Sequence, residues 1–99
     1  MLKIEYSSRF KRDYKKIAKD QDTVAKIREV LTLLVNEKQL PAKNRPHPLA
    51  GNYQNYMECH IKPDLLLVYR INDNLLILEL FRIGSHSGGY RKISVNLKS

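Results

Sequence analysis

The sequence has little that would crosslink the chain or anchor it in a membrane. Cys59 is the only cysteine, which excludes an intramolecular disulfide, disfavours a thiolate metal site and suits a reducing compartment. The N-terminal segment lacks the apolar core of a signal peptide, and no apolar run approaches the roughly 20 residues that span a bilayer. We therefore expect a soluble, cytoplasmic protein with no membrane partner.

Acidic residues are also scarce. The chain has 10 Asp and Glu against 18 Lys and Arg, a formal net charge of +8. Such a surface attracts polyanions and releases their counterions, so nucleic acid or an acidic protein is the natural partner. The length of 99 residues allows one core, and we expect a single domain over residues 1–99.

The first half of the chain has the patterns of one strand and two helices. Residues 2–6 alternate apolar and charged positions, as a half-buried strand does. Ser7 and Ser8 can cap an amphipathic helix over residues 9–19, and a second helix is expected to have Asp22 or Thr23 as its cap and to end near residues 37–39. Because their connection is short, the two helices are expected to form an antiparallel hairpin.

The second half is rich in strand-forming residues. Residues 40–55 carry three of the four prolines and no clear periodicity, which predicts a loop. Three strands follow, over residues 56–61, 65–71 and 75–83. The order predicts an α+β domain of two layers, with an N-terminal strand, a helix hairpin and an antiparallel β meander. Residues 65–69 are apolar without alternation, so their strand is expected to be central, and Cys59 is expected to be a small core residue.

The residues with the most chemical potential gather at the predicted strand ends. His60 and Asp64 flank the Lys62-Pro63 turn, which should bring them close together. The third strand of the meander runs back toward that turn, so Arg82 and His86 are expected beside them.

This set suits RNA cleavage without a metal. A base must remove a proton from a ribose 2′-hydroxyl, an acid must protonate the leaving oxygen, and a cation must stabilise the phosphorane. Histidine serves both proton-transfer roles near neutral pH, and the arginine fork matches two phosphate oxygens. Taken singly, a histidine on the surface, Asp64 in a turn or Arg82 in solvent can have a purely structural role. The hypothesis therefore rests on the expected convergence of these residues at one place. The spacings of the three histidines match no familiar metal-ligand motif, and we expect no cofactor.

Three strings of sequence resemble the YafQ-like branch of the RelE/ParE toxin superfamily. They are His47-Pro48-Leu49-x-Gly51-Asn52-Tyr53, the run ECHIKPDLLLVY from Glu58 to Tyr69, and Arg82-Ile83-Gly84-Ser85-His86-Ser87. The resemblance extends to about Tyr90 and implies the RelE-like two-layer domain, with residues 91–99 as a C-terminal extension.

The resemblance also implies a function. Members of this branch are toxins of type II toxin–antitoxin systems that cleave messenger RNA on the ribosome and so inhibit translation. By similarity, His86 is the general acid, Arg82 holds the scissile phosphate, and His47, His60 and Asp64 share the base and orienting roles. Tyr90 would stack on a base, and Lys62 and Arg91 would contact RNA. The expected protein partner is a cognate antitoxin.

Three departures and two alternatives accompany this assignment. The stretch from Asn72 to Phe81 is about two residues longer than expected for the family, which affects the register of Arg82. Met57 stands where relatives commonly have arginine, and Leu65 where some have an aromatic residue. A gyrase-inhibiting, ParE-like toxin would not need the histidine set, and a catalytically inactive ribosome-binding relative would need only charge and Tyr90.

Overall fold

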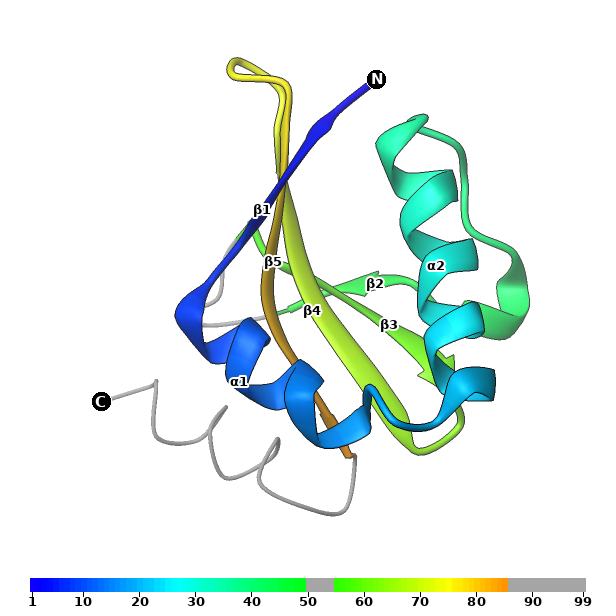
Figure 1. Ribbon diagram of the computed structural model, residues 1–99. Helices are drawn as coiled ribbons and strands as arrows, with labels where there is room; N and C mark the ends of the chain where they lie inside the picture. The colour runs from blue at the N-terminus through cyan, green and yellow to red at the C-terminus, as the bar shows by residue number, and fades with distance from the viewer. Residues whose placement is uncertain (50–54, 86–99) are drawn as a thin grey trace.

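The computed structural model describes residues 1–49 and 55–85, which form two layers, with helices on one side of a sheet (Figure 1). Along the chain the elements are β1 (Lys3–Tyr6), α1 (Ser8–Ile17), α2 (Gln21–Val35), the 3-10 helix η1 (Ala42–Asn44), β2 (His47–Pro48), β3 (Met57–Lys62), β4 (Leu65–Asn72) and β5 (Ile77–Ser85). No helix in this described part is both long and apolar enough to cross a membrane.

The five strands lie in the order β1-β5-β4-β3-β2, so β4 is central as predicted. The pairs β2–β3, β3–β4 and β4–β5 are antiparallel, whereas β1 runs parallel to β5. The predicted α+β class and the antiparallel meander are therefore confirmed, within a mixed sheet that β1 completes. The sequence pattern did not reveal η1 or β2, which occupy part of the predicted loop.

Local hydrogen bonds fix where each helix begins. The Ser7 hydroxyl accepts from the Phe10 backbone N–H at 2.9 Å and donates to the Phe81 carbonyl at 2.6 Å, so the cap of α1 also ties it to β5. This cap was predicted. The cap of α2 is Asp20 and not Asp22 or Thr23, because its carboxylate accepts from the backbone N–H groups of both these residues.

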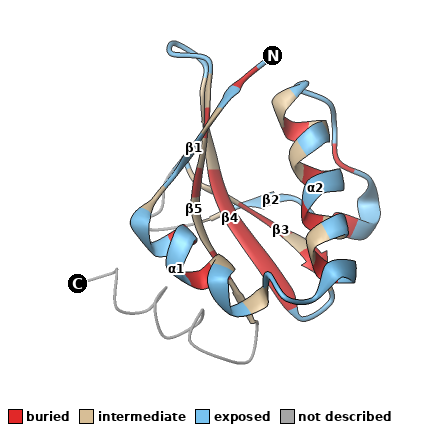
Figure 2. Ribbon diagram, in the orientation of Figure 1, coloured by how far each residue is buried: buried red, intermediate tan, exposed pale blue. Residues whose placement is uncertain are grey.

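β4 is buried on both faces, which explains its unbroken apolar run. On the helix side, Leu67 and Tyr69 join the main core with Cys59, Leu78 and Phe10. On the opposite side, a second cluster forms around two residues of β4, with three partly buried neighbours: Leu66, Val68, Leu49, Tyr56 and Phe81. Figure 2 shows β4 as the most continuously buried strand of the sheet.

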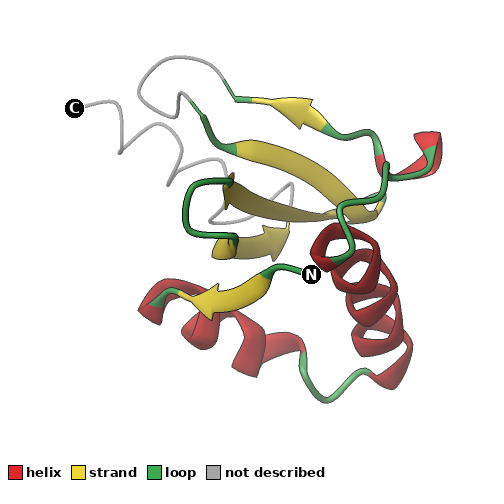
Figure 3. Cartoon of the chain, turned by 90° about the horizontal axis from the view of Figure 1, so that it is seen from above, coloured by secondary structure: helices red, strands yellow, loops and turns green. Residues whose placement is uncertain are grey.

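The helices cover different parts of the sheet. α1 lies against β5, while α2 lies against β3 at the other side (Figures 1 and 3). They follow one another as predicted, and side chains of both helices join the main core, among them Phe10 of α1 and Ile27 of α2. Each helix also has its own attachment to the sheet, through Ser7 for α1 and through Ile27, Val30 and Leu34 for α2.

Candidate active site

The strand register brings the predicted site residues that the structure describes toward one end of the sheet. His47 lies opposite Glu58, Glu58 opposite Val68, and Val68 opposite Arg82, which makes one row across four strands. Two positions farther along β3, His60 lies opposite Leu66, and Leu66 lies opposite Gly84. The end of β5 therefore returns to the level of the β3–β4 turn, as the antiparallel topology predicts.

Asp64 lies in that turn and contacts the end of β5. The Ser85 hydroxyl donates to Asp64 Oδ2 at 3.3 Å, and Ser85 pairs with Leu65, the residue after Asp64. His86 follows Ser85 directly in sequence, but His86, Tyr90 and Arg91 all lie outside the described residues. The contact shows that β5 ends beside the Asp64 carboxylate.

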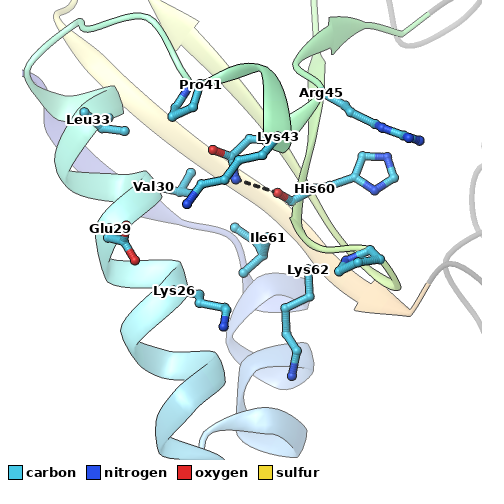
Figure 4. Close-up of a pocket in the computed structure, with 12 residues that line it drawn as sticks. Lys26, Glu29, Val30, Leu33, Pro41, Lys43, Arg45, His60, Ile61 and Lys62 are labelled. Carbon is cyan, nitrogen blue, oxygen red and sulfur yellow. Dashed lines mark hydrogen bonds between the residues drawn. The ribbon is translucent and has the colours of Figure 1, made fainter.

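His60 is half-buried on the sheet face that bears Leu66 and Val68 and not on the helix side. Its backbone carbonyl accepts a hydrogen bond of 2.8 Å from the side-chain amide of the buried Asn44, which fixes η1 against β3. In Figure 4 the His60 ring points away from α2 and lies near the side chain of Arg45.

His47 forms a pair with a carboxylate to which sequence reasoning gave no role. Its Nε2 lies 2.9 Å from Glu58 Oε1, and its Nδ1 lies 2.9 Å from the Arg45 carbonyl oxygen. A carbonyl oxygen can only accept, so Nδ1 is the donor in its hydrogen bond to Arg45, while Nε2 faces the Glu58 carboxyl group. Both ring nitrogens of His47 are thus directed at partners within the protein.

Glu58 is buried, with 8% of its surface exposed. A buried carboxylate is stable only when it is paired and hydrogen-bonded, and His47 provides this. The available sequence signal was the alternation of β3, which places Glu58 and His60 on one face.

Arg82 is held by Asp13 of α1. Asp13 accepts from Arg82 Nε at 2.7 Å and Nη2 at 3.1 Å, and also from the Ile83 backbone N–H at 3.1 Å. Phe81 is an extra residue in β5, since Val68 pairs with Arg82 while Tyr69 pairs with Leu80. This bulge falls at the end of the stretch from Asn72 to Phe81, whose greater length affects the register of Arg82. Asp13 uses two of the five guanidinium N–H groups and so orients Arg82 without occupying it fully.

Comparison with known proteins decides the family. Residues 2–88 match the family model described as a bacterial toxin of type II toxin–antitoxin systems, YafQ. The chain belongs to this YafQ toxin family. The resemblance carried by the His47, His60 and His86 strings is therefore confirmed.

Relatives and solved structures agree with the family assignment. The chain is 38% identical over 85 residues to the mRNA interferase toxin YafQ of Escherichia coli (strain K12), covering 85% of this chain and 90% of that one. A metal-bound toxin from Helicobacter pylori is 42% identical with a TM-score of 0.81, over 88% of this chain and 97% of the other. The E. coli DinJ–YafQ complex matches at 34% identity with a TM-score of 0.77, over 88% of this chain and 96% of the other.

In this member of the YafQ family, Lys62 is tied to the start of α2. Its Nζ donates to Thr23 Oγ1 at 3.0 Å and lies 3.7 Å from Asp20 Oδ2. Hydrogen bonds from Thr23, with a smaller contribution from the Lys62 charge, lower the pKa of Asp20 below its ordinary value. Across residues 1–49 and 55–85, no three His, Cys, Asp or Glu side chains are grouped closely enough to hold a metal ion.

Proposed function

We propose that this toxin is an endoribonuclease, an mRNA interferase that cleaves messenger RNA on the ribosome and thereby inhibits translation. Relatives at 38% identity bear the name mRNA interferase toxin. The observation that carries the proposal for this chain is the shared sheet end of the His47–Glu58 pair, His60, Asp64 and the strand leading to His86. These groups supply acid–base chemistry, and we propose that cleavage proceeds without a metal cofactor.

We propose that His60 or Asp64 is the general base that removes the 2′-hydroxyl proton, because both ring nitrogens of His47 already face partners, Arg45 and Glu58. His47 then has an orienting role. His86 is the proposed general acid, which protonates the leaving 5′-oxygen as the 2′,3′-cyclic phosphate forms. The Ser85–Asp64 hydrogen bond positions the end of β5 from which His86 extends.

Arg82 is proposed to stabilise the charge that develops on the phosphate. Asp13 binds its Nε and Nη2 edge, which leaves the N–H groups of Nη1 for an anion. An arginine oriented in advance loses less conformational entropy when the phosphate arrives. Tyr90 and Arg91 are proposed to contact the RNA by stacking and by charge, and Lys62 by charge next to the turn.

The protein partner is proposed to be a cognate antitoxin in the cytoplasm. A solved relative is a complex of YafQ with DinJ, and the charge of +8 on this chain favours an acidic partner. We expect such a partner to block access to the end of the sheet that holds His60 and Asp64.

One experiment tests the proposed function. The wild-type toxin and the variants His86→Ala and Glu5→Gln are expressed under tight control, and messenger RNA ends are mapped by primer extension. Glu5 lies exposed on β1, so its variant is the matched control for expression. New ends within coding regions that appear with wild type and Glu5→Gln, but not with His86→Ala, support the proposal. Growth arrest with intact messages, or with damaged DNA as a gyrase inhibitor would produce, refutes it.

A further inference from the structure

A basic groove lies beside His60. It runs between α2, η1 and the end of β3 and has a volume of about 450 Å³. Its lining includes four cationic side chains and one carboxylate: Lys26, Lys43, Arg45, Lys62 and Glu29. Figure 4 shows these chains coming from both walls, with the His60 ring at the side nearest Arg45.

Asn44 holds one wall of this groove in place. Its side chain is buried at 5% exposure and donates to the His60 carbonyl, so η1 cannot move away from β3 without breaking that bond. The neighbouring Lys43 and Arg45 are both exposed. The buried Asn44 therefore holds one cationic residue in place on each side of it in the sequence.

The backbone at Arg45 adds a second fixed element. Arg45 has φ 44°, a left-handed conformation that is unfavourable for a residue with a Cβ. This turn ends η1 and directs the Arg45 carbonyl to His47 Nδ1, so the groove wall and the His47–Glu58 pair are built from one segment.

The charges in the groove are not equally available. Lys26 pairs with Asp22 at 3.1 Å, and Lys62 is held by Thr23 and Asp20. Within the described ranges, no ion pair is found for Lys43 or Arg45. These two side chains, next to a histidine of the site, are the ones placed to bind an anion.

We propose that this groove binds the sugar–phosphate backbone of the single-stranded RNA that the toxin cleaves, through Lys43 and Arg45. The inference rests on the proposed function and adds a binding track beside the reacting phosphate. A polyanionic strand fits a groove with cations on both walls, and a strand that enters at His60 can continue along η1. A duplex is not needed, because the recognised group is the backbone phosphate.

The test measures binding of a short fluorescent RNA whose riboses are 2′-O-methylated, so that it cannot be cut. Wild type is compared with Lys43→Gln/Arg45→Gln over a series of salt concentrations. Each phosphate contact to a single strand contributes about 0.7 to the slope of log affinity against log salt. The double variant should lose about 1.4 from that slope, which corresponds to roughly 25-fold weaker binding near 0.1 M salt.

The matched control is Lys3→Gln/Arg12→Gln, which removes one lysine and one arginine charge from exposed positions on β1 and α1. It should change the affinity by less than about twofold, and both double variants should keep the wild-type melting temperature. Equal losses in the two double variants would overturn the proposal, as would wild type that does not bind the RNA at low salt.

A further arm identifies the source of the RNA. If the Lys43/Arg45 variant binds the oligonucleotide normally but binds empty ribosomes more weakly, the groove holds ribosomal RNA and the proposal is wrong. Failure of the proposed function would look different, because messages would then stay intact in cells while oligonucleotide binding still depended on Lys43 and Arg45.

Discussion

Replacing Asp13 with alanine should destabilise the protein by about 3 kcal/mol, at the lower end of the cost of breaking a buried ion pair. Only 10% of the Asp13 side chain and 15% of the Arg82 side chain are exposed, so water cannot substitute for the lost carboxylate. The change leaves three N–H groups without their acceptor, two on Arg82 and one on the Ile83 backbone.

The assay is thermal unfolding followed by circular dichroism. For a domain of this size, about 3 kcal/mol corresponds to a melting temperature lower by roughly 12–24 °C. The matched control is Glu79→Ala, which breaks the ion pair between Arg70 of β4 and Glu79 of β5. Those side chains are 36% and 25% exposed, so the loss should stay near or below about 1 kcal/mol.

A double-mutant cycle then separates stability from catalysis. Asp13→Ala/Arg82→Ala should be more stable than the sum of the single changes predicts, by about 1–3 kcal/mol, because the uncompensated charge is gone. If Arg82 also holds the phosphate, Arg82→Ala should reduce cleavage more than Asp13→Ala does. The reasoning is refuted if Asp13→Ala loses less than about 1 kcal/mol, or no more than Glu79→Ala.

Three further outcomes are expected. Glu58→Gln should reduce cleavage less than His86→Ala, which should lose about 100-fold or more. Glu58→Gln should also shift the nitrogen NMR signals of the His47 ring, and an unchanged spectrum would contradict the pairing. Burial raises the pKa of the Cys59 thiol to about 12, so a thiol reagent should react near pH 8 only as the chain unfolds, and fast reaction would argue against this burial. The pKa of Asp20 is lowered in the folded state, so its carboxylate stabilises the fold above the unfolded-state pKa, and this stabilisation is lost as the pH falls through the folded-state pKa. Asp20→Ala should therefore lower the melting temperature at pH 7 but hardly near pH 2. An equal effect at both pH values would count against the cap.

Local patterns were enough to predict much of the fold. The run from Leu65 to Tyr69 indicated a central strand, and the structure shows burial on both of its faces. Ser7 was correctly identified as a helix cap, because capping depends on residues within one turn. The proximity of the β5 end to Asp64 followed from antiparallel topology alone.

Contacts between distant residues could not be predicted in this way. Asp13 and Arg82 are 69 positions apart, and nothing in the α1 pattern distinguishes Asp13 from a solvated carboxylate. The anchoring of Asn44 to His60 depends on how the loop crosses β3, and the bulge at Phe81 depends on the pairing of β4 with β5.

The pairing of β1 with β5 also sets the order in which the protein can be completed during synthesis. The first strand made, Lys3–Tyr6, pairs with Ile77–Leu80, and the Ser7 hydroxyl bonds a carbonyl 74 positions later. Such distant pairing is slow to form and requires β5 to have left the exit tunnel. While most of the chain is being translated, β5 and the residues after it have not yet been made, so under the proposed function a partly synthesised chain cannot cleave RNA.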